Sequence, residues 1–177
     1  MNSIVLYGIP GVGKRTVGEK IAEKLGYTFL QNHTILDFVR SFFPDRKNYP
    51  ICLQVTRIVR ESILIGLIEA QEKGAVNTVA GGSPGALERI ASWVNAVEEH
   101  GGKVFLVELK ADLEVIRKRI EEPDRAKWHK ITKQHELDEF LQKDYFKGIP
   151  GRESVVIDNT NLSPDACANL IIEKLGL

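Results

Sequence analysis

Short apolar runs alternate along the chain with longer stretches in which hydrophobic residues recur every three or four positions. The short runs suit strands, and the longer period suits helices. Their alternation is typical of βα units, which build a parallel sheet covered by helices. Strands are predicted over residues 3–7, 28–30, 75–80, 103–109 and 154–157, and helices over residues 13–25, 34–43, 51–73, 84–100, 111–121, 134–145 and 164–175. The pattern therefore predicts an α/β fold.

Several helix ends are marked by glycine or proline. Glycine tolerates the left-handed backbone that ends a helix, and it follows the last turn of four helical stretches, at Gly26, Gly74, Gly101 and Gly176. Two helix starts carry a Ser-Pro pair, at residues 83–84 and 163–164. Serine is a good N-cap and proline suits the first helical position.

The chain shows no linker or break in composition, so residues 1–177 are expected to form a single domain. Cover for a binding site is expected from two inserted segments, residues 38–50 and 117–133. The second of these is the predicted lid.

Charge and composition narrow the range of functions. The 24 lysines and arginines balance 24 aspartates and glutamates, which argues against a general binder of nucleic acid or of anionic membranes. The two cysteines, Cys52 and Cys167, lack partners at metal-ligand spacing, and a reducing compartment fits them best. No stretch approaches about 18 uninterrupted apolar residues, and the start lacks a signal-peptide pattern. We therefore expect a cytoplasmic protein.

A glycine-rich segment follows the first predicted strand and precedes an amphipathic helix. Residues 8–14, here called the phosphate loop, read Gly-Ile-Pro-Gly-Val-Gly-Lys and match the G-x-x-x-x-G-K pattern. Glycines let backbone N–H groups turn toward an anion, and the helix N-terminus adds its positive end. The lysine reaches the outer phosphates of a nucleotide. The predicted phosphate-binding residues are Gly8, Gly11, Val12, Gly13, Lys14, Arg15 and Thr16.

The metal site departs from the usual pattern. The position after Lys14 normally holds a serine or threonine whose hydroxyl binds Mg²⁺, but here it holds Arg15, with Thr16 next. Neighbouring helix residues differ in direction by about 100°, so Thr16 is not a simple substitute. Either the loop is turned so that Thr16 reaches Mg²⁺, or phosphates and water hold the metal while Arg15 adds positive charge. The predicted strand 75–80 also ends without the usual supporting carboxylate.

On these residues the chain resembles small P-loop kinases of the shikimate kinase, nucleoside monophosphate kinase and chloramphenicol phosphotransferase type. The likeness runs nearly end to end and rests on residues 8–16, 32–33, 107–114 and 157–164, where it is similar to a branch of bacterial and archaeal kinase-like ATPases. The resemblance implies a three-layer P-loop NTPase fold with a five-stranded parallel sheet of order 2-3-1-4-5 and a small lid. It also implies binding of ATP with Mg²⁺. Shikimate kinases have Asp-x-Asp where residues 31–33 read Gln-Asn-His, so shikimate is doubtful as the acceptor.

The predicted lid is strongly basic. Residues 117–133 contain seven lysines and arginines against three acids, and phosphoryl transfer needs such charge around the migrating group. By resemblance to monophosphate kinases, Arg119 would lie on the adenine and Arg125 would touch the transferred phosphate. The same resemblance places Asn161 and Pro164 beside the adenine. A solvated helix end with ordinary ion pairs is the alternative explanation of the lid charges.

Candidates for acceptor binding lie mainly in residues 31–60. Asn32, His33 and Asp37 follow the second predicted strand, and either His33 or Asp37 could take the proton of an acceptor hydroxyl. Asp37 could instead pair with Arg40 or Arg57. By resemblance, the glycines at 81–82, Gly81 and Gly82, let an acceptor lie close to the backbone.

Two arginines share one face of the predicted helix 51–73. Arg57 and Arg60 are three residues apart, so their guanidinium groups could clamp a phosphate or carboxylate of the acceptor. Ion pairs with neighbouring acids would also explain them. The opposite face is expected to pack in the core through Val55, Ile58, Val59, Ser62 and Ile65.

Three functions fit these features. The first is a kinase that transfers the γ-phosphoryl group of ATP to a small-molecule hydroxyl or phosphate. The second is an adenylate-kinase-like enzyme acting on nucleoside monophosphates. The third is a nucleotide-binding or regulatory NTPase without such an acceptor, which Arg15 and the missing strand-end carboxylate favour. The expected partners are ATP or ADP and a small molecule, with the chain as a monomer or homodimer.

Overall fold

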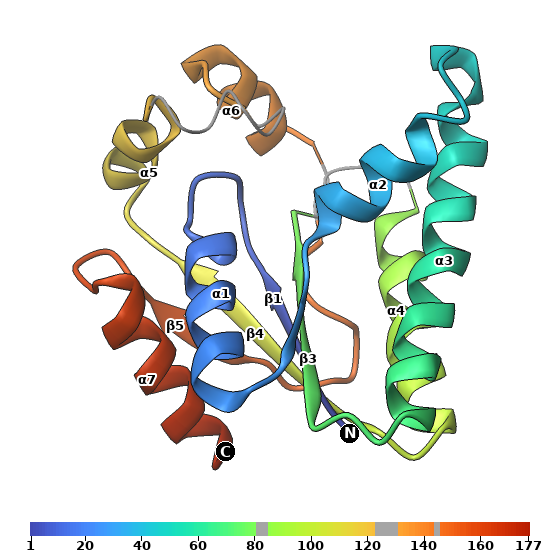
Figure 1. The fold of residues 1–177 in the computed structure, drawn as a ribbon. Helices are drawn as coiled ribbons and strands as arrows, with labels where there is room; N and C mark the ends of the chain where they lie inside the picture. The colour runs from blue at the N-terminus through green and yellow to red at the C-terminus, as the bar shows by residue number, and fades with distance from the viewer. Residues whose placement is uncertain (81–84, 123–130, 144–145) are drawn as a thin grey trace.

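The sheet has the predicted strand order. The computed structural model describes residues 1–80, 85–122, 131–143 and 146–177. In these residues five parallel strands form one sheet of order β2-β3-β1-β4-β5 (Figure 1). The strands are β1 (Asn2–Tyr7), β2 (Thr28–Leu30), β3 (Gly74–Val79), β4 (Lys103–Lys110) and β5 (Val155–Asp158). The prediction of a 2-3-1-4-5 P-loop sheet is therefore confirmed.

Helices cover both faces of the sheet and its upper edge (Figure 1). The helices are α1 (Lys14–Leu25), α2 (Asn32–Arg40), α3 (Tyr49–Glu69), α4 (Ala86–Glu99), α5 (Leu113–Ile120), α6 (Gln134–Leu141) and α7 (Pro164–Leu175), with a short 3₁₀ turn η1 (Arg46–Asn48) before α3. Every predicted helix is present. None of the described helices is long and apolar enough to cross a membrane.

The central strand β1 divides the core into two layers. Ile4 and Leu6 pack on one face with residues of α1, α5 and α7, while Val5 and Tyr7 pack on the other with residues of α3 and α4. This alternation follows from the two-residue period of side chains along a strand. Because all strands are parallel, their carboxyl ends share one edge, where α1, α2 and α4 begin or approach (Figure 1).

Most of the predicted helix ends are confirmed. Gly26, Gly101 and Gly176 have φ of 65°, 79° and 67°, and the Ser163 hydroxyl accepts a hydrogen bond from Ala166 N–H. The prediction at Gly74 was wrong. Helix α3 already ends at Glu69, the left-handed position falls on Gln71 with φ 59°, and Gly74 opens β3 against the ring of Tyr27. The Ser-Pro pair at 83–84 lies outside the described residues.

The predicted core face of α3 was also wrong. Cys52, Thr56, Arg60 and Leu64 are buried, whereas Ile58 is 47% exposed. The two polar members of the buried face have partners, as buried polar groups must. The Thr56 hydroxyl donates to the Cys52 carbonyl at 2.7 Å. Hydrogen bonding of this kind cannot be read from the period of apolar residues.

Arg60 is the largest fully buried side chain and links four elements. Its Nη1 donates to Asn77 Oδ1 at 3.0 Å, and Asn77 Nδ2 donates to Ser3 Oγ at 3.3 Å. Its guanidinium carbon lies 4.5 Å from the centre of the Trp93 ring. Burial lowers the pKa of Arg60 to about 10, so the group stays charged at neutral pH. The chain of contacts joins α3, β3, β1 and α4.

Candidate functional site

The phosphate loop joins β1 to α1 through three glycines in the left-handed half of φ space. Gly8, Gly11 and Gly13 have φ of 144°, 89° and 98°. A Cβ atom on Gly8 would collide with the carbonyl oxygen of Leu109, and one on Gly11 would lie 2.8 Å from methyl groups of α5. Any other residue would be strained at these positions and would push the loop away from β4 and α5.

The loop delivers a lysine and a helix N-terminus to the carboxyl edge of the sheet. Helix α1 starts at Lys14, and its N-cap, Gly13, provides no side-chain hydrogen bond to the first turn. The first-turn N–H groups of a helix have no partner within the helix and favour anions. Lys14 Nζ folds back and donates to the carbonyls of Gly8 and Ile9, at 2.7 and 2.8 Å. The loop therefore fits a phosphate chain, with the lysine lying over it.

Buried polar contacts support the loop from behind. Asn159, just after β5, is 3% exposed, and its Nδ2 donates to the Val12 carbonyl at 2.7 Å. Arg119 on α5 holds Asn159 in turn, because Nη1 donates to Asn159 Oδ1 at 3.2 Å and Nη2 to Asn159 O at 3.1 Å. Sequence reasoning named Arg119 and Asn161 for the adenine but missed Asn159. The only available signal was its position as the first residue after β5.

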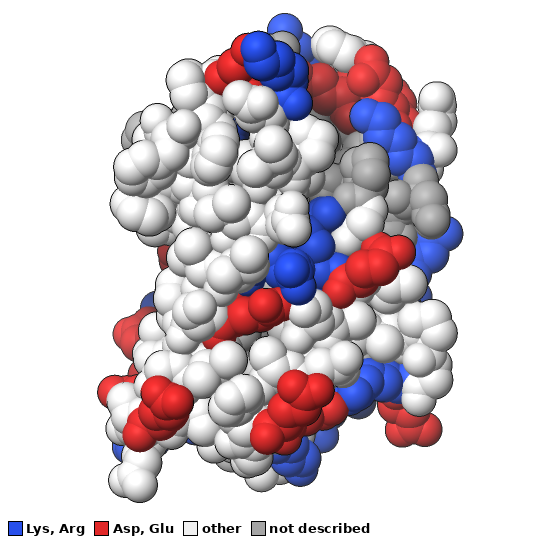
Figure 2. All heavy atoms as spheres, turned by 90° about the vertical axis from the view of Figure 1, so that its right-hand side faces the viewer, with Lys and Arg blue, Asp and Glu red and all other residues white. Residues whose placement is uncertain are grey.

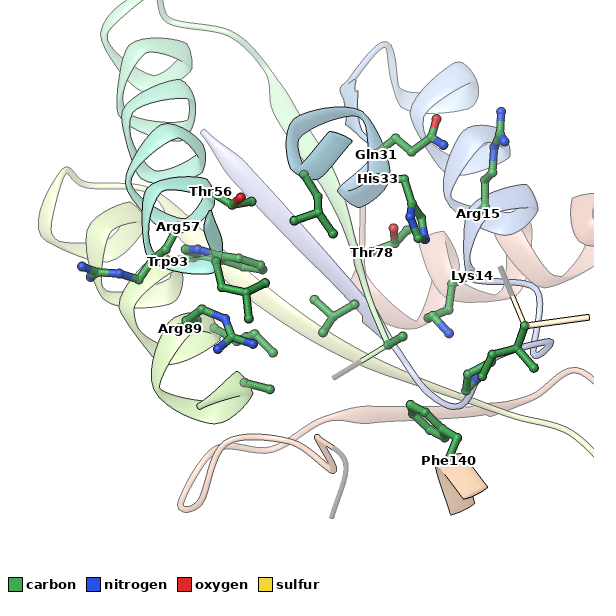
Figure 3. Close-up of a pocket in the computed structure, with 18 of the residues that line it drawn as sticks. Lys14, Arg15, Gln31, His33, Thr56, Arg57, Thr78, Arg89, Trp93 and Phe140 are labelled. Carbon is green, nitrogen blue, oxygen red and sulfur yellow. The ribbon is translucent and has the colours of Figure 1, made fainter. Parts of the chain in front are cut away.

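A cavity of about 470 Å³ opens beside the loop, between α1, α2, α3, α4 and α6 (Figure 3). Ligands of open α/β sheets bind at this carboxyl edge. Its polar and charged lining residues are Lys14, Arg15, Thr16, Gln31, His33, Tyr49, Thr56, Arg57, Thr78 and Arg89. Apolar residues, including Leu36, Leu53, Val79, Ile90, Trp93 and Phe140, complete the wall.

Arg15 and Thr16 both line the cavity, so both roles considered for the metal keep a residue in place. Arg15 Nε donates to Glu19 at 2.7 Å, one turn along α1. In the described parts of the chain, no three His, Cys, Asp or Glu side chains are grouped to hold a metal ion.

The acceptor-side candidates are placed unequally. His33 and Arg57 line the cavity. Asp37 lies on the exposed side of α2, where its carboxylate is 4.0 Å from Arg40, and it does not line the cavity. Arg60 lies in the core behind Trp93.

Other candidates have no place in the cavity wall. Asn32 is the first residue of α2, and Asn161 and Pro164 lie at the exposed start of α7. Gly81, Gly82 and Arg125 lie outside the described residues. The adenine contacts and the phosphate contact of Arg125 stay predictions.

Two residues of α4 were missed. Arg89 and Trp93 are one helical turn apart and both line the cavity. The first turns of the helix after β3 necessarily lie near the carboxyl edge, and that rule could have found them. Arg89 stands alone beside Glu88 in the sequence, so the search for clustered arginines passed over it.

The comparisons with known proteins agree with this geometry. A family model described as AAA domain matches residues 4–147, which is most of the chain. The chain belongs to the AAA domain family. Among curated proteins, none matches the sequence.

Solved structures of similar fold include several kinases. A sugar kinase from Janibacter sp. HTCC2649 has a TM-score of 0.66 at 15% identity, covering 99% of this chain and 95% of its own. The Deinococcus radiodurans tunicamycin resistance protein has a TM-score of 0.66 at 18% identity, covering 100% and 97%. The Mycobacterium tuberculosis APS kinase, solved with AMPPNP and APS, has a TM-score of 0.61 at 17% identity, covering 99% and 98%. This AAA domain protein therefore has the predicted P-loop kinase fold.

The support behind the loop yields a test of the site. Replacing Asn159 by Ala removes the donor to the Val12 carbonyl and leaves that buried group without its partner. We expect the free energy of unfolding to fall by roughly 1–3 kcal/mol, measured by urea denaturation. Asn169→Ala, at an exposed position on α7, is the matched control and should change stability little. Equal effects of the two substitutions would contradict the supporting role of Asn159.

Proposed function

We propose that this protein is an ATP-dependent small-molecule kinase, which transfers the γ-phosphoryl group of ATP to a hydroxyl or phosphate oxygen of an acceptor. One observation carries the proposal. The residues that follow the phosphate loop, Lys14 to Thr16, are themselves part of the cavity wall. The outer phosphate of a bound nucleotide would therefore face an enclosed space large enough for a small molecule, as in-line transfer requires.

Each residue of this arrangement has a distinct task in the proposed reaction. The bond from the γ-phosphorus to the bridging oxygen breaks, a bond to the acceptor oxygen forms, and ADP leaves. Lys14 neutralises charge on the outer phosphates, and Arg125 does the same from the lid. ATP brings Mg²⁺, for which the exposed Thr16 hydroxyl is the candidate protein ligand.

His33 is the better candidate for proton transfer from an acceptor hydroxyl. It lies in the cavity wall beside Lys14 and Thr78 (Figure 3), whereas Asp37 faces outward near Arg40. A general base must come within hydrogen-bond reach of the proton that it takes. Asp37 would need α2 to rotate before it could do so.

The cavity argues against a nucleotide-binding module without an acceptor, because such a module has no use for an enclosed space beside the phosphates. A nucleoside monophosphate acceptor stays within the proposal, since its phosphate oxygen needs no base. Formation of ADP from ATP and AMP would identify that case. The sequence has no Asn-Lys-x-Asp run for guanine, so ATP is the proposed donor rather than GTP.

The direct test is a transfer assay. The protein is incubated with γ-labelled ATP and Mg²⁺ against a panel of hydroxylated metabolites, antibiotics and nucleoside monophosphates. We expect the label to move to one class of acceptor, and Lys14→Ala to abolish transfer and to weaken ATP binding by about 10–100-fold in calorimetry. Lys20→Ala, at an ion pair further along α1, is the control. Equal ATP affinity of the Lys14→Ala protein and the parent would contradict the proposal.

The choice of base gives a separate prediction for a hydroxyl acceptor. His33→Ala should lower the transfer rate by roughly 10²–10⁴-fold while ATP affinity stays nearly the same. Asp37→Asn is the matched substitution on the same helix and should lower the rate far less. The reverse order of the two effects in a steady-state assay would move the base to Asp37.

A further inference from the structure

The cavity has two chemically different ends (Figure 3). Lys14, Arg15 and Thr16 form one end, where the phosphates of a nucleotide are expected. Arg57 and Arg89 lie at the other end, on α3 and α4. Apolar side chains such as Leu53, Ile90 and Trp93 line the space between them. The inference below rests on the proposed function, because it concerns the acceptor of the same site.

The two arginines at the far end are held differently. Arg57 Nη1 donates to Ser92 Oγ at 3.0 Å and to Glu61 at 3.3 Å, and its guanidinium points away from the cavity (Figure 3). Arg89 points its guanidinium into the cavity (Figure 3). The two groups are therefore not equivalent, and Arg89 is the one placed to meet an acceptor.

The surroundings of Arg89 favour an anion. Its Nη1 lies beside Gly85, where a Cβ atom would come within 3.2 Å of it, and Gly85 caps the N-terminus of α4. A cation gains nothing from the positive end of a helix, whereas an anion is stabilised there. Burial lowers the pKa of Arg89, while Tyr49 and Glu88 act in the opposite direction. An anionic ligand would restore the charge interactions that burial removes from this guanidinium.

Trp93 provides a fixed wall next to Arg89. Its side chain is one turn along α4 and only 7% exposed, and Arg60 supports its ring from the core through the contact at 4.5 Å. Two donor atoms of the cavity-lining residues, Trp93 Nε1 and Gln31 Nε2, are buried without a hydrogen-bond partner in the described part of the chain. Buried donors of this kind call for an acceptor group, which the oxygen atoms of a ligand would supply.

The far end is also open to the surface. A groove of about 400 Å³ shares Tyr49, Leu53, Arg57 and Arg89 with the cavity wall. Figure 2, which faces α3 and α4, shows basic side chains between acidic ones in the middle of this face. An acceptor can therefore enter or extend through this side while its reacting oxygen faces the phosphate loop.

We propose that the acceptor carries an anionic group, a carboxylate or a phosphate, remote from its reacting oxygen, with an apolar or planar body between them. Arg89 binds the anionic group, and Trp93 supports the body. Arg89 thus determines which acceptors are used. This assigns the specificity role to α4 and not to the arginine pair of α3.

Matched probes test the assignment without requiring the true acceptor. Benzoate and its neutral counterpart benzamide are titrated into the full chain without nucleotide, and binding is followed by ligand-observed NMR. We expect benzoate to bind more tightly than benzamide. Arg89→Gln should weaken benzoate binding by at least about 10-fold and leave benzamide binding nearly unchanged. Arg89→Lys should fall between, and Arg152→Gln, at a surface ion pair with Glu98, should have no effect.

Phenyl phosphate then separates the two anionic groups. Tighter binding of phenyl phosphate than of benzoate, with the same dependence on Arg89, would assign a phosphorylated acceptor. The opposite order would assign a carboxylate. Circular dichroism of each variant checks that it is folded, and Arg89→Lys keeps the test valid if Arg89→Gln is not.

Three results would overturn the inference. These are no binding of benzoate to the parent chain, equal binding of benzoate and benzamide, or benzoate binding that is lost in Lys14→Ala but kept in Arg89→Gln. The last result would place the anion at the phosphate loop. Binding of AMPPNP is measured separately on the same proteins. Loss of nucleotide binding alone contradicts the proposed kinase and leaves the anion site standing, so the two failures are distinguishable.

Discussion

The close approach of the phosphate loop to β4 and α5 is the constraint on which the rest of the site depends. Gly8 passes so near the Leu109 carbonyl, and Gly11 so near the methyl groups of α5, that neither position has room for a side chain. The chain can turn tightly only because these glycines adopt positive φ. The turn places the N-terminus of α1 and Lys14 at the carboxyl edge of the sheet, and the cavity forms around that point.

Two buried polar chains connect this edge to the interior. Asn159, held by Arg119, binds the back of the phosphate loop, while Arg60, bound to Asn77, lies behind Trp93 at the other end of the cavity. Both chains begin in the sheet or immediately after a strand. Satisfied polar networks of this kind fix side chains more precisely than apolar contacts do. The cavity therefore has a supported wall at the phosphate end and at the far end.

Much of the fold followed from the sequence, and part of the site did not. The strand order and all predicted helices were confirmed, because apolar periodicity and glycine positions report local backbone structure. The inner face of α3 was predicted wrongly, because Thr56 and Arg60 are buried by partners that sequence spacing cannot show. The sequence indicated the phosphate loop through a continuous motif. Arg89 and Asn159 carry no such motif and become visible only when distant segments meet.

The central claim is that the phosphate loop and the cavity are one site for two substrates. A crystal structure of the protein with AMPPNP and Mg²⁺ tests it most directly. The account predicts the β- and γ-phosphates in the loop beside Lys14, with the γ-phosphate at the mouth of the cavity and facing His33. A loop without nucleotide at saturating AMPPNP, or a γ-phosphate directed to solvent on the side away from the cavity, would contradict it.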